Sequence, residues 1–364
     1  MRTIFTLFFG IFAVMALSNA IVPVLPYYDE SSVIQGAIYS AYFLGAFVST
    51  LPAGILSDRY GRVPVMRTGI AITVISGLLL SVLLLPLPVI IARFLEGVGG
   101  GFFVAGSMSY VNSLPDHEKK SGYFMALLNS GLVIGLVFAG WLTAQTLNPV
   151  SGIRVFSGLC LIPAVAGFFI CETGPLCLKG DNNKGDHKAL NRLIKEYWWL
   201  WYSSIILIGI TGVITSLYPK FSGYSTDSVG IWISFMSCAT IAAVLAASRL
   251  SLPPVITIRW CAFLMIIGVM VTFYSPLGFV MLGILAGVVM IAQMAFLAHV
   301  RDHQGATMGL FSTTSYLGMA VLPVLAGIIA DSAGFFSAFC MTALVAVTVF
   351  LTIGRCGCRQ QTAG

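Results

Sequence analysis

Two charged side chains stand close together in a stretch of the chain that is otherwise apolar. Arg93 and Glu96 lie between Ala92 and Gly101, and a spacing of three residues places them on one face of a helix. Charges deep in a membrane are costly, and they normally face a cavity or one another. Glu96 could therefore couple protons or contact a substrate, with Arg93 as its partner or as an anion contact. The alternative is a structural ion pair that fixes the helix against its neighbours.

Three amides are the other polar candidates inside apolar runs. They are Asn19, Asn129 and Gln293. A lone amide in a membrane helix can contact a ligand or bond to a neighbouring helix, and the sequence leaves both interpretations open. The four histidines are dispersed near the ends of apolar runs, and they predict neither a catalytic nor a metal site. Cys356 and Cys358 could bind a metal or carry a lipid, but two ligands do not complete a zinc site.

The composition makes these segments membrane spans. Of 364 residues, 58% are hydrophobic and 9% are charged, whereas about a quarter of the residues in soluble domains are charged. Apolar runs of about 20 residues, the length of a helix that crosses a bilayer, recur from end to end. The alternating pattern of a membrane β-barrel is absent. The expected fold class is an all-α integral membrane protein without a soluble domain that could bind nucleic acid.

Breaks at charges, proline and glycine predict twelve transmembrane helices. The first begins like a cleavable leader, but its apolar run continues to Tyr27, and we expect it to be retained. One long polar stretch predicts a six-helix bundle over 1–172, a cytoplasmic linker over 173–196 and a second six-helix bundle over 197–364. The predicted spans are 4–27, 33–56, 64–85, 88–111, 121–145, 153–172, 197–219, 228–249, 254–274, 277–299, 306–330 and 334–354.

Basic residues predict the orientation. Most of the 19 Lys and Arg residues fall in segments that share a side with the N-terminus, the linker among them. Lys and Arg are enriched in cytoplasmic loops, so we expect both termini to lie in the cytoplasm.

The two halves are related by a weak internal repeat. A shift of 187 residues superimposes glycine and alanine positions of the fifth and eleventh predicted helices. Repeats of this kind characterise secondary transporters, whose halves rock about a central site. The matched pairs are Gly122 with Gly309, Gly131 with Gly318, Ala139 with Ala326 and Gly140 with Gly327.

A polar stretch between the second and third predicted spans carries a family resemblance. It reads Gly54-Ile55-Leu56-Ser57-Asp58-Arg59-Tyr60-Gly61-Arg62, and its glycines permit a sharp turn. It resembles the Gly-x-Leu-x-Asp-Arg-x-Gly-Arg signature of the major facilitator superfamily, except that Val63 stands where a further basic residue is usual. The run around Arg93 resembles the second motif of that family. The resemblance extends over essentially the whole chain and favours the drug and metabolite exporter branch.

The resemblance implies the major facilitator fold, with two pseudo-symmetric bundles. It implies that helices one, four, seven and ten line the cavity, so the candidates for substrate binding or proton coupling are Asn19, Arg93, Glu96 and Gln293, and Asn129 lies on helix five. It further implies that Asp58 meets the start of the eleventh helix near Gly305–Gly309 and latches the halves. The gating motif is then Gly54, Asp58, Arg59, Gly61 and Arg62; the alternative is that its cations only anchor the topology.

A similar comparison bears on the direction of transport. The run from Gly131 to Gly140 resembles the antiporter motif of the superfamily, but Leu136 replaces its proline, which Pro323 keeps in the second half.

The expected function is alternating-access transport across the plasma membrane. Few polar groups in the predicted cavity favour proton-coupled export of a small hydrophobic or amphipathic compound by a monomer, with no cofactor. The sequence has no Gly-rich phosphate loop ending in Lys-Ser/Thr, so we do not expect ATP to drive transport. Uptake of a small organic anion or metabolite is the alternative. A membrane sensor or membrane enzyme would belong to a different class, and we do not expect an enzyme.

Overall fold

The computed structural model describes residues 2–112, 117–169, 194–247, 250, 253–298 and 304–355. Ten helices of this part of the chain are long and apolar enough to cross a membrane, and α6 is a shorter apolar helix. The elements are α1 (Arg2–Ala20), η1 (Val22–Tyr27), α2 (Ser32–Tyr60), α3 (Arg62–Leu80), α4 (Pro86–Asn112), α5 (His117–Thr146), α6 (Ser151–Gly167), α8 (Trp198–Phe221), α9 (Thr226–Ala247), α10 (Pro254–Tyr274), α11 (Gly278–Ala298), α12 (Gln304–Thr352) and η2 (Ile353–Arg355).

The helix α12 accounts for two of the predicted spans. Its 49 residues would extend roughly 70 Å at 1.5 Å per residue, more than twice the thickness of the hydrocarbon layer. The backbone leaves helical geometry at Gly334, where φ is 85°, and there the chain reverses. With α12 counted as two spans, the described residues hold the twelve predicted helices. The loop expected between the last two spans is reduced to this one glycine.

The polar stretch after the second span is another place where the prediction was wrong. We expected the span to end near residue 56, but α2 continues to Tyr60 and α3 begins at Arg62. The turn consists of Gly61, whose φ of 98° and ψ of 156° are accessible to glycine and strained for other residues. Most of the motif is therefore the last helical turns of α2.

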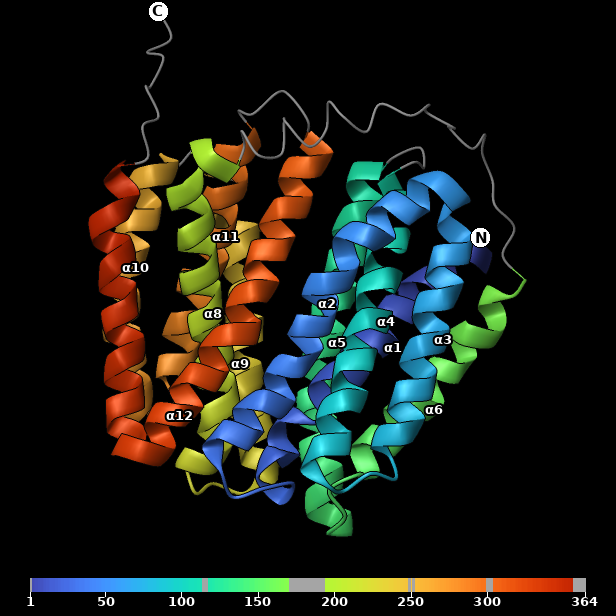
Figure 1. The fold of residues 1–364 in the computed structure, drawn as a ribbon, viewed down its shortest axis with the longest axis horizontal. Coiled ribbons are helices and arrows are strands. Elements are labelled where there is room, and N and C mark those ends of the chain that lie inside the picture. Colours follow the sequence, from blue (N-terminus) through green and yellow to red (C-terminus); the bar gives the residue numbers. More distant parts are fainter. Residues whose placement is uncertain are drawn as a thin grey trace, which may run out of the picture.

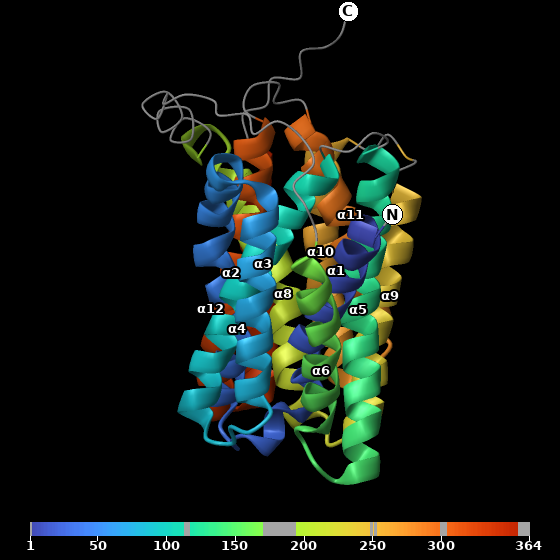
Figure 2. The same ribbon diagram turned by 90° about the vertical axis from the view of Figure 1, so that its right-hand side faces the viewer.

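The helices form two groups that lie side by side. Helices α1 to α6 occupy one side of the molecule and α8 to α12 the other, as Figure 1 shows. Three helix pairs join the groups: α2 contacts both α12 and α8, and α5 contacts α9. Figure 2 shows α5 beside α9. The short helix η1 also bridges the groups, because it contacts α5 of its own half and both α8 and α9 of the other.

Repeat-related glycines pack in equivalent ways inside the two halves. A Cβ at Gly131 on α5 would collide with the carbonyl oxygen of Phe12 on α1. A Cβ at Gly318 on α12 would collide with the carbonyl oxygen of Ile205 on α8. The fifth helix of one half and the eleventh helix of the other thus approach their neighbours through matching positions of the internal repeat.

A second repeat pair packs between the halves. A Cβ at Gly140 would lie 2.7 Å from the carbonyl oxygen of Thr226 on α9, and one at Gly327 would lie 2.5 Å from that of Ser32 on α2. Both contacts lie at the end of the molecule where α2 and α9 begin, which is the predicted outer end. The expected linker lies outside the described residues, apart from 194–196, and so do Cys356 and Cys358.

Candidate functional site

The charged pair predicted on the fourth span is present and fully enclosed. Arg93 and Glu96 project from one face of α4, and Nη1 of Arg93 lies 2.5 Å from Oε2 of Glu96. Their side chains are 1% and 0% exposed. A charge-assisted hydrogen bond of this length is strong in a medium that excludes water. The two opposite charges therefore stabilise each other in a place where burying either charge alone would cost much free energy.

An aromatic ring from α2 completes the surroundings of the pair. The guanidinium carbon of Arg93 lies 4.9 Å from the centroid of the Tyr42 ring, a cation–π distance. The glycines of α4 make this possible, because a Cβ at Gly97 would collide with the carbonyl oxygen of Tyr42 and one at Gly100 would lie 2.6 Å from its hydroxyl oxygen. These glycines let α2 and α4 pack closely, which places Tyr42 against Arg93.

The pair retains unused hydrogen-bonding capacity. Among the described residues, Nε of Arg93, Oε1 of Glu96 and the hydroxyl of Tyr28 are buried without a partner. Leaving such groups unsatisfied costs about 1–3 kcal/mol each. A proton, a water molecule or a polar group of a substrate would be stabilised by binding here, so the arrangement can do more than hold helices together.

The second half contributes its own polar cluster. Gln293 on α11 is 0% exposed, and its Nε2 donates to Oγ of Ser203 on α8 over 2.9 Å. Its Oε1 has no partner within the described residues. One residue along α8, the hydroxyls of Ser204 and Ser315 lie 3.1 Å apart. The structure thus places an unsatisfied acceptor in the second half, on the two helices that correspond to the predicted spans seven and ten.

Asn19 links two helices of the first half. Asn19 on α1 donates from Nδ2 to the backbone carbonyl of Leu132 on α5 over 3.2 Å, which links two helices of the same half. Asn129 is half-buried on α5. For Asn19 the observed contact matches the interhelical alternative left open by the sequence.

The expected gating motif falls only partly within the described residues. Gly54 faces open space, since a Cβ there would meet nothing within 4 Å, and Gly61 forms the turn. The side chains of Asp58 and Arg59, and those of residues 301–309, lie outside the part of the chain that the structure describes. The contact of Asp58 with the start of the eleventh helix therefore stays a prediction.

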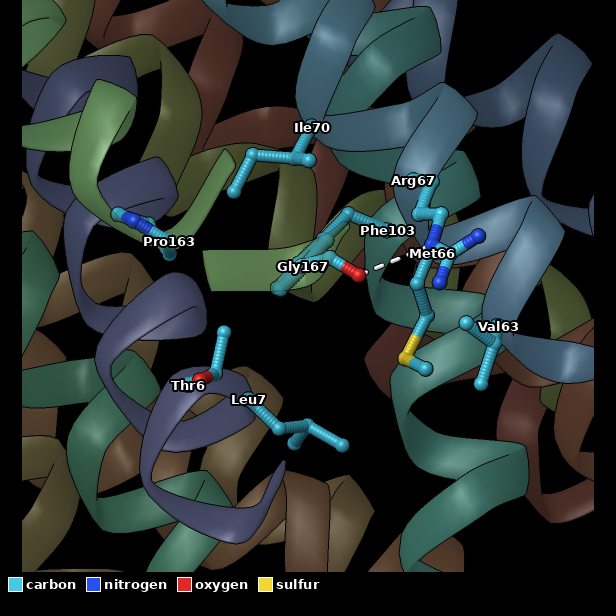
Figure 3. A pocket seen from close by; sticks show the side chains of 9 residues that line it. All are labelled: Thr6, Leu7, Val63, Met66, Arg67, Ile70, Phe103, Pro163 and Gly167. Carbon is cyan, nitrogen blue, oxygen red and sulfur yellow. Dashed lines mark hydrogen bonds between the residues drawn. The ribbon is translucent and has the colours of Figure 1, made fainter. Parts of the chain in front are cut away.

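A basic residue near the motif has a structural role that the charge pattern did not reveal. Arg67 donates from Nε to the carbonyl of Gly167 over 2.9 Å and from Nη2 to that of Phe168 over 3.1 Å. A cation at the C-terminus of α6 satisfies carbonyls that the helix leaves free. Figure 3 shows this guanidinium beside a cavity between α1, α3, α4 and α6. Its volume of about 20 Å³ holds roughly one water molecule and excludes an organic substrate.

Comparisons with known proteins agree with this architecture. A family model described as Major Facilitator Superfamily matches residues 7–318. The "Probable anion transporter 6, chloroplastic" of Arabidopsis thaliana is 28% identical over 184 residues, or 50% of this chain and 35% of that protein. The "Quinolone resistance protein NorA" of Staphylococcus aureus is 24% identical over 148 residues, 39% of this chain and 38% of its own. The alignments thus span little more than a third of each curated relative.

A solved structure extends the similarity to nearly all of the chain. The crystal structure of the nucleoside transporter NupG matches with a TM-score of 0.77, covering 98% of this chain and 99% of the other. At 13% identity, this match concerns the fold alone.

Proposed function

The chain belongs to the major facilitator superfamily, and from this premise we propose that it exports small hydrophobic or amphipathic organic compounds in exchange for protons. Membership makes it a multi-pass membrane transporter and not an enzyme. The proposed part is the direction, the coupling and the substrate class. In this scheme the two halves rock about a central site, so that the site opens to one side of the membrane at a time.

The observation that carries the proposal is the buried pair with its unsatisfied oxygen. Glu96 shares Oε2 with Arg93, while Oε1 has no partner among the described residues. A proton that binds this carboxyl removes its negative charge and weakens its hold on Arg93. Arg93 would then rely on the Tyr42 ring until the proton leaves. Protonation thus changes the contacts between α4 and α2, and α2 also contacts the other half through α12.

Two observations support an apolar substrate that leaves the cell. The polar groups of the two clusters are few, which suits a pocket that binds mainly through apolar surface. In addition, a relative is named for resistance to quinolones. The acceptor Oε1 of Gln293 would orient such a substrate from the second half, and Arg93 and Glu96 would do so from the first.

Uptake of a small organic anion is the second candidate. It is favoured by the free Nε of Arg93, a donor that an anionic group could use, and by a relative named as an anion transporter. An anion would accept a hydrogen bond from this Nε and would be bound by the positive charge of Arg93. Its transport would then not require exchange for a proton.

The remaining assignments belong to the same proposal. The bundles 1–172 and 197–364 are the two rocking units, joined by 173–196, in a monomer of the plasma membrane with both termini in the cytoplasm. The motif formed by Gly54, Asp58, Arg59, Gly61 and Arg62 closes the inner end. Asn19 supports the packing of α1 against α5, and Asn129 stays a candidate for substrate binding or proton coupling.

The test follows proton movement in sealed liposomes that contain the purified protein and a pH-sensitive dye. Addition of a candidate amphipathic cation should drive proton flux in the unaltered protein and not in Glu96→Gln, which should still bind the compound. Glu30→Gln is the matched control, because Glu30 is an exposed acid at the end of the molecule where α2 begins, and it should keep the flux. Unchanged transport and unchanged pH dependence in Glu96→Gln would exclude coupling through this residue.

A further inference from the structure

One carboxylate of the second half holds the start of a helix in the first half. Asp331 lies near the Gly334 break of α12, and its Oδ1 accepts from the backbone N–H of Ser32 over 2.9 Å. Its Oδ2 accepts from Oγ of Ser31 over 2.6 Å and from the backbone N–H of Val33 over 3.1 Å. These donors belong to the N-cap and first two residues of α2. A single side chain thus receives three hydrogen bonds across the boundary between the halves.

The contact with Asp331 supplies hydrogen-bond acceptors to the first backbone N–H groups of α2. The first N–H groups of a helix have no partner within it, and its dipole favours a negative charge at that end. Ser31 already caps α2 locally, since its side chain accepts weakly from the N–H of Ile34 at 3.5 Å. The stronger cap comes from Asp331, some 300 residues further along the chain. The start of α2 therefore keeps its stronger cap only while α12 remains beside it.

A cation of the second half also faces this carboxylate. Nζ of Lys220, at the end of α8, lies 3.4 Å from Oδ1 of Asp331, and the two side chains are 29% and 28% exposed. An ion pair with this exposure contributes little by itself. Lys220 belongs to the same half as Asp331, so it can stay with the carboxylate when α2 leaves. It offers the freed charge a partner and does not hold the halves together.

The backbones beside the carboxylate are in close contact. A Cβ at Gly36 on α2 would lie 2.7 Å from the carbonyl oxygen of Pro323, and Gly327 approaches Ser32 in the same way. Further along the same two helices, the rings of Phe43 and Tyr316 are 6.3 Å apart. Figure 1 shows α2 and α12 side by side at this end of the molecule. The halves are therefore joined here by a continuous seam that begins at Asp331.

We propose that Asp331 is the latch of the outer gate and holds the two halves together at that end while the inner end is open. The proposal rests on alternating access, and it complements the inner-end motif around Asp58. When the halves rock, Asp331 releases the three donors of α2, and the seam behind it separates.

The test measures the width of the outer end directly. Spin labels at Leu85, in the turn between α3 and α4, and at Leu277, in the turn between α10 and α11, report one half each. Both positions are exposed, at 71% and 65%, and neither takes part in the contacts of Asp331. In a background without the eight native cysteines, Asp331→Asn should raise the ratio of long to short distances about tenfold, the equivalent of about one charge-assisted hydrogen bond.

Matched variants decide between a latch and a general effect of charge. Asp29→Asn changes the same charge at the same end, but Asp29 accepts from Ser31 within its own half, so the distances should stay as they are. Ser31→Ala removes one donor and should shift them in the direction of Asp331→Asn, by less. An unchanged distribution in both Asp331→Asn and Ser31→Ala would overturn the latch. Because the readout needs neither substrate nor protons, it is independent of whether the export test succeeds.

Discussion

The buried pair on α4 can be tested by removing its members one at a time and then together. Arg93→Met keeps most of the length of the side chain but leaves Glu96, at 0% exposure, without the guanidinium that its Oε2 contacts. Removing one member of a buried ion pair costs about 3–5 kcal/mol, because an uncompensated charge stays behind. Glu96→Leu should cost a similar amount, since Arg93 would then rely on the Tyr42 ring alone.

The double variant should behave differently from the sum of the two single ones. With both charges replaced, no buried charge lacks a partner, and apolar replacements of buried pairs are often neutral or stabilising by about 1–4 kcal/mol. We therefore expect Arg93→Met with Glu96→Leu to recover most of the stability of the unaltered chain. Since each single substitution costs about 3–5 kcal/mol, the coupling energy of the cycle should be about 5 kcal/mol or more, above the range of about 0.5–3 kcal/mol that is usual for residues in contact.

The assay is unfolding by a denaturing detergent, which gives the free energy of unfolding of all four proteins, with proton flux in liposomes measured alongside. A stable double variant without substrate-driven proton flux would separate the functional role of the pair from its structural one. If each single substitution costs less than about 1 kcal/mol, as at exposed ion pairs, the pair is hydrated and the reasoning from burial is wrong.

Two further predictions concern glycines. Gly97→Ala should lower the melting temperature and the yield of folded protein, because its Cβ would collide with the carbonyl of Tyr42. Gly54→Ala is the control and should melt like the unaltered chain, because position 54 faces open space. Equal melting curves for the two variants would contradict the close approach of α2 and α4. Gly61→Ala should cost about 1–3 kcal/mol of unfolding free energy, because φ is 98° there and such a conformation strains residues with a Cβ. If Gly61→Ala unfolds like the unaltered chain, the single-residue turn is wrong.

Much of the fold could be predicted from the sequence, because hydrophobic runs and glycine spacing are local signals. The runs located twelve helices, and the spacing of Gly131 and Gly140 located the repeat. What the sequence could not supply was the extent of α2. A charged helical turn that projects beyond the hydrocarbon layer has the same composition as a loop, so the motif was expected to be one.

The candidate site was predicted only in part, because only some of its residues give a local signal in the sequence. Arg93 and Glu96 were found because charged residues are rare in apolar segments. Residues that are three positions apart also share one face of a helix. Tyr42 was not among the candidates, since nothing in the local sequence shows that a ring on α2 lies close to a guanidinium on α4. Asp331 gave no signal at all: its contacts with Ser31 and Ser32 exist only because the fold brings the two chain segments together.

The glycines between the halves have a consequence for the speed of the transport cycle. Gly140 and Gly327 each bring one helix against the backbone of a helix in the opposite half, near Thr226 and Ser32. Where backbone meets backbone, separation does not require long side chains to withdraw from one another and find new rotamers. In the proposed alternating-access cycle, such contacts would favour a low activation barrier for reorientation, and the equilibrium between the two orientations would depend on other contacts, such as those of Asp331. Glycines at these two helix crossings would therefore favour a high turnover rate. Substrate affinity would depend on the residues of the proposed central site.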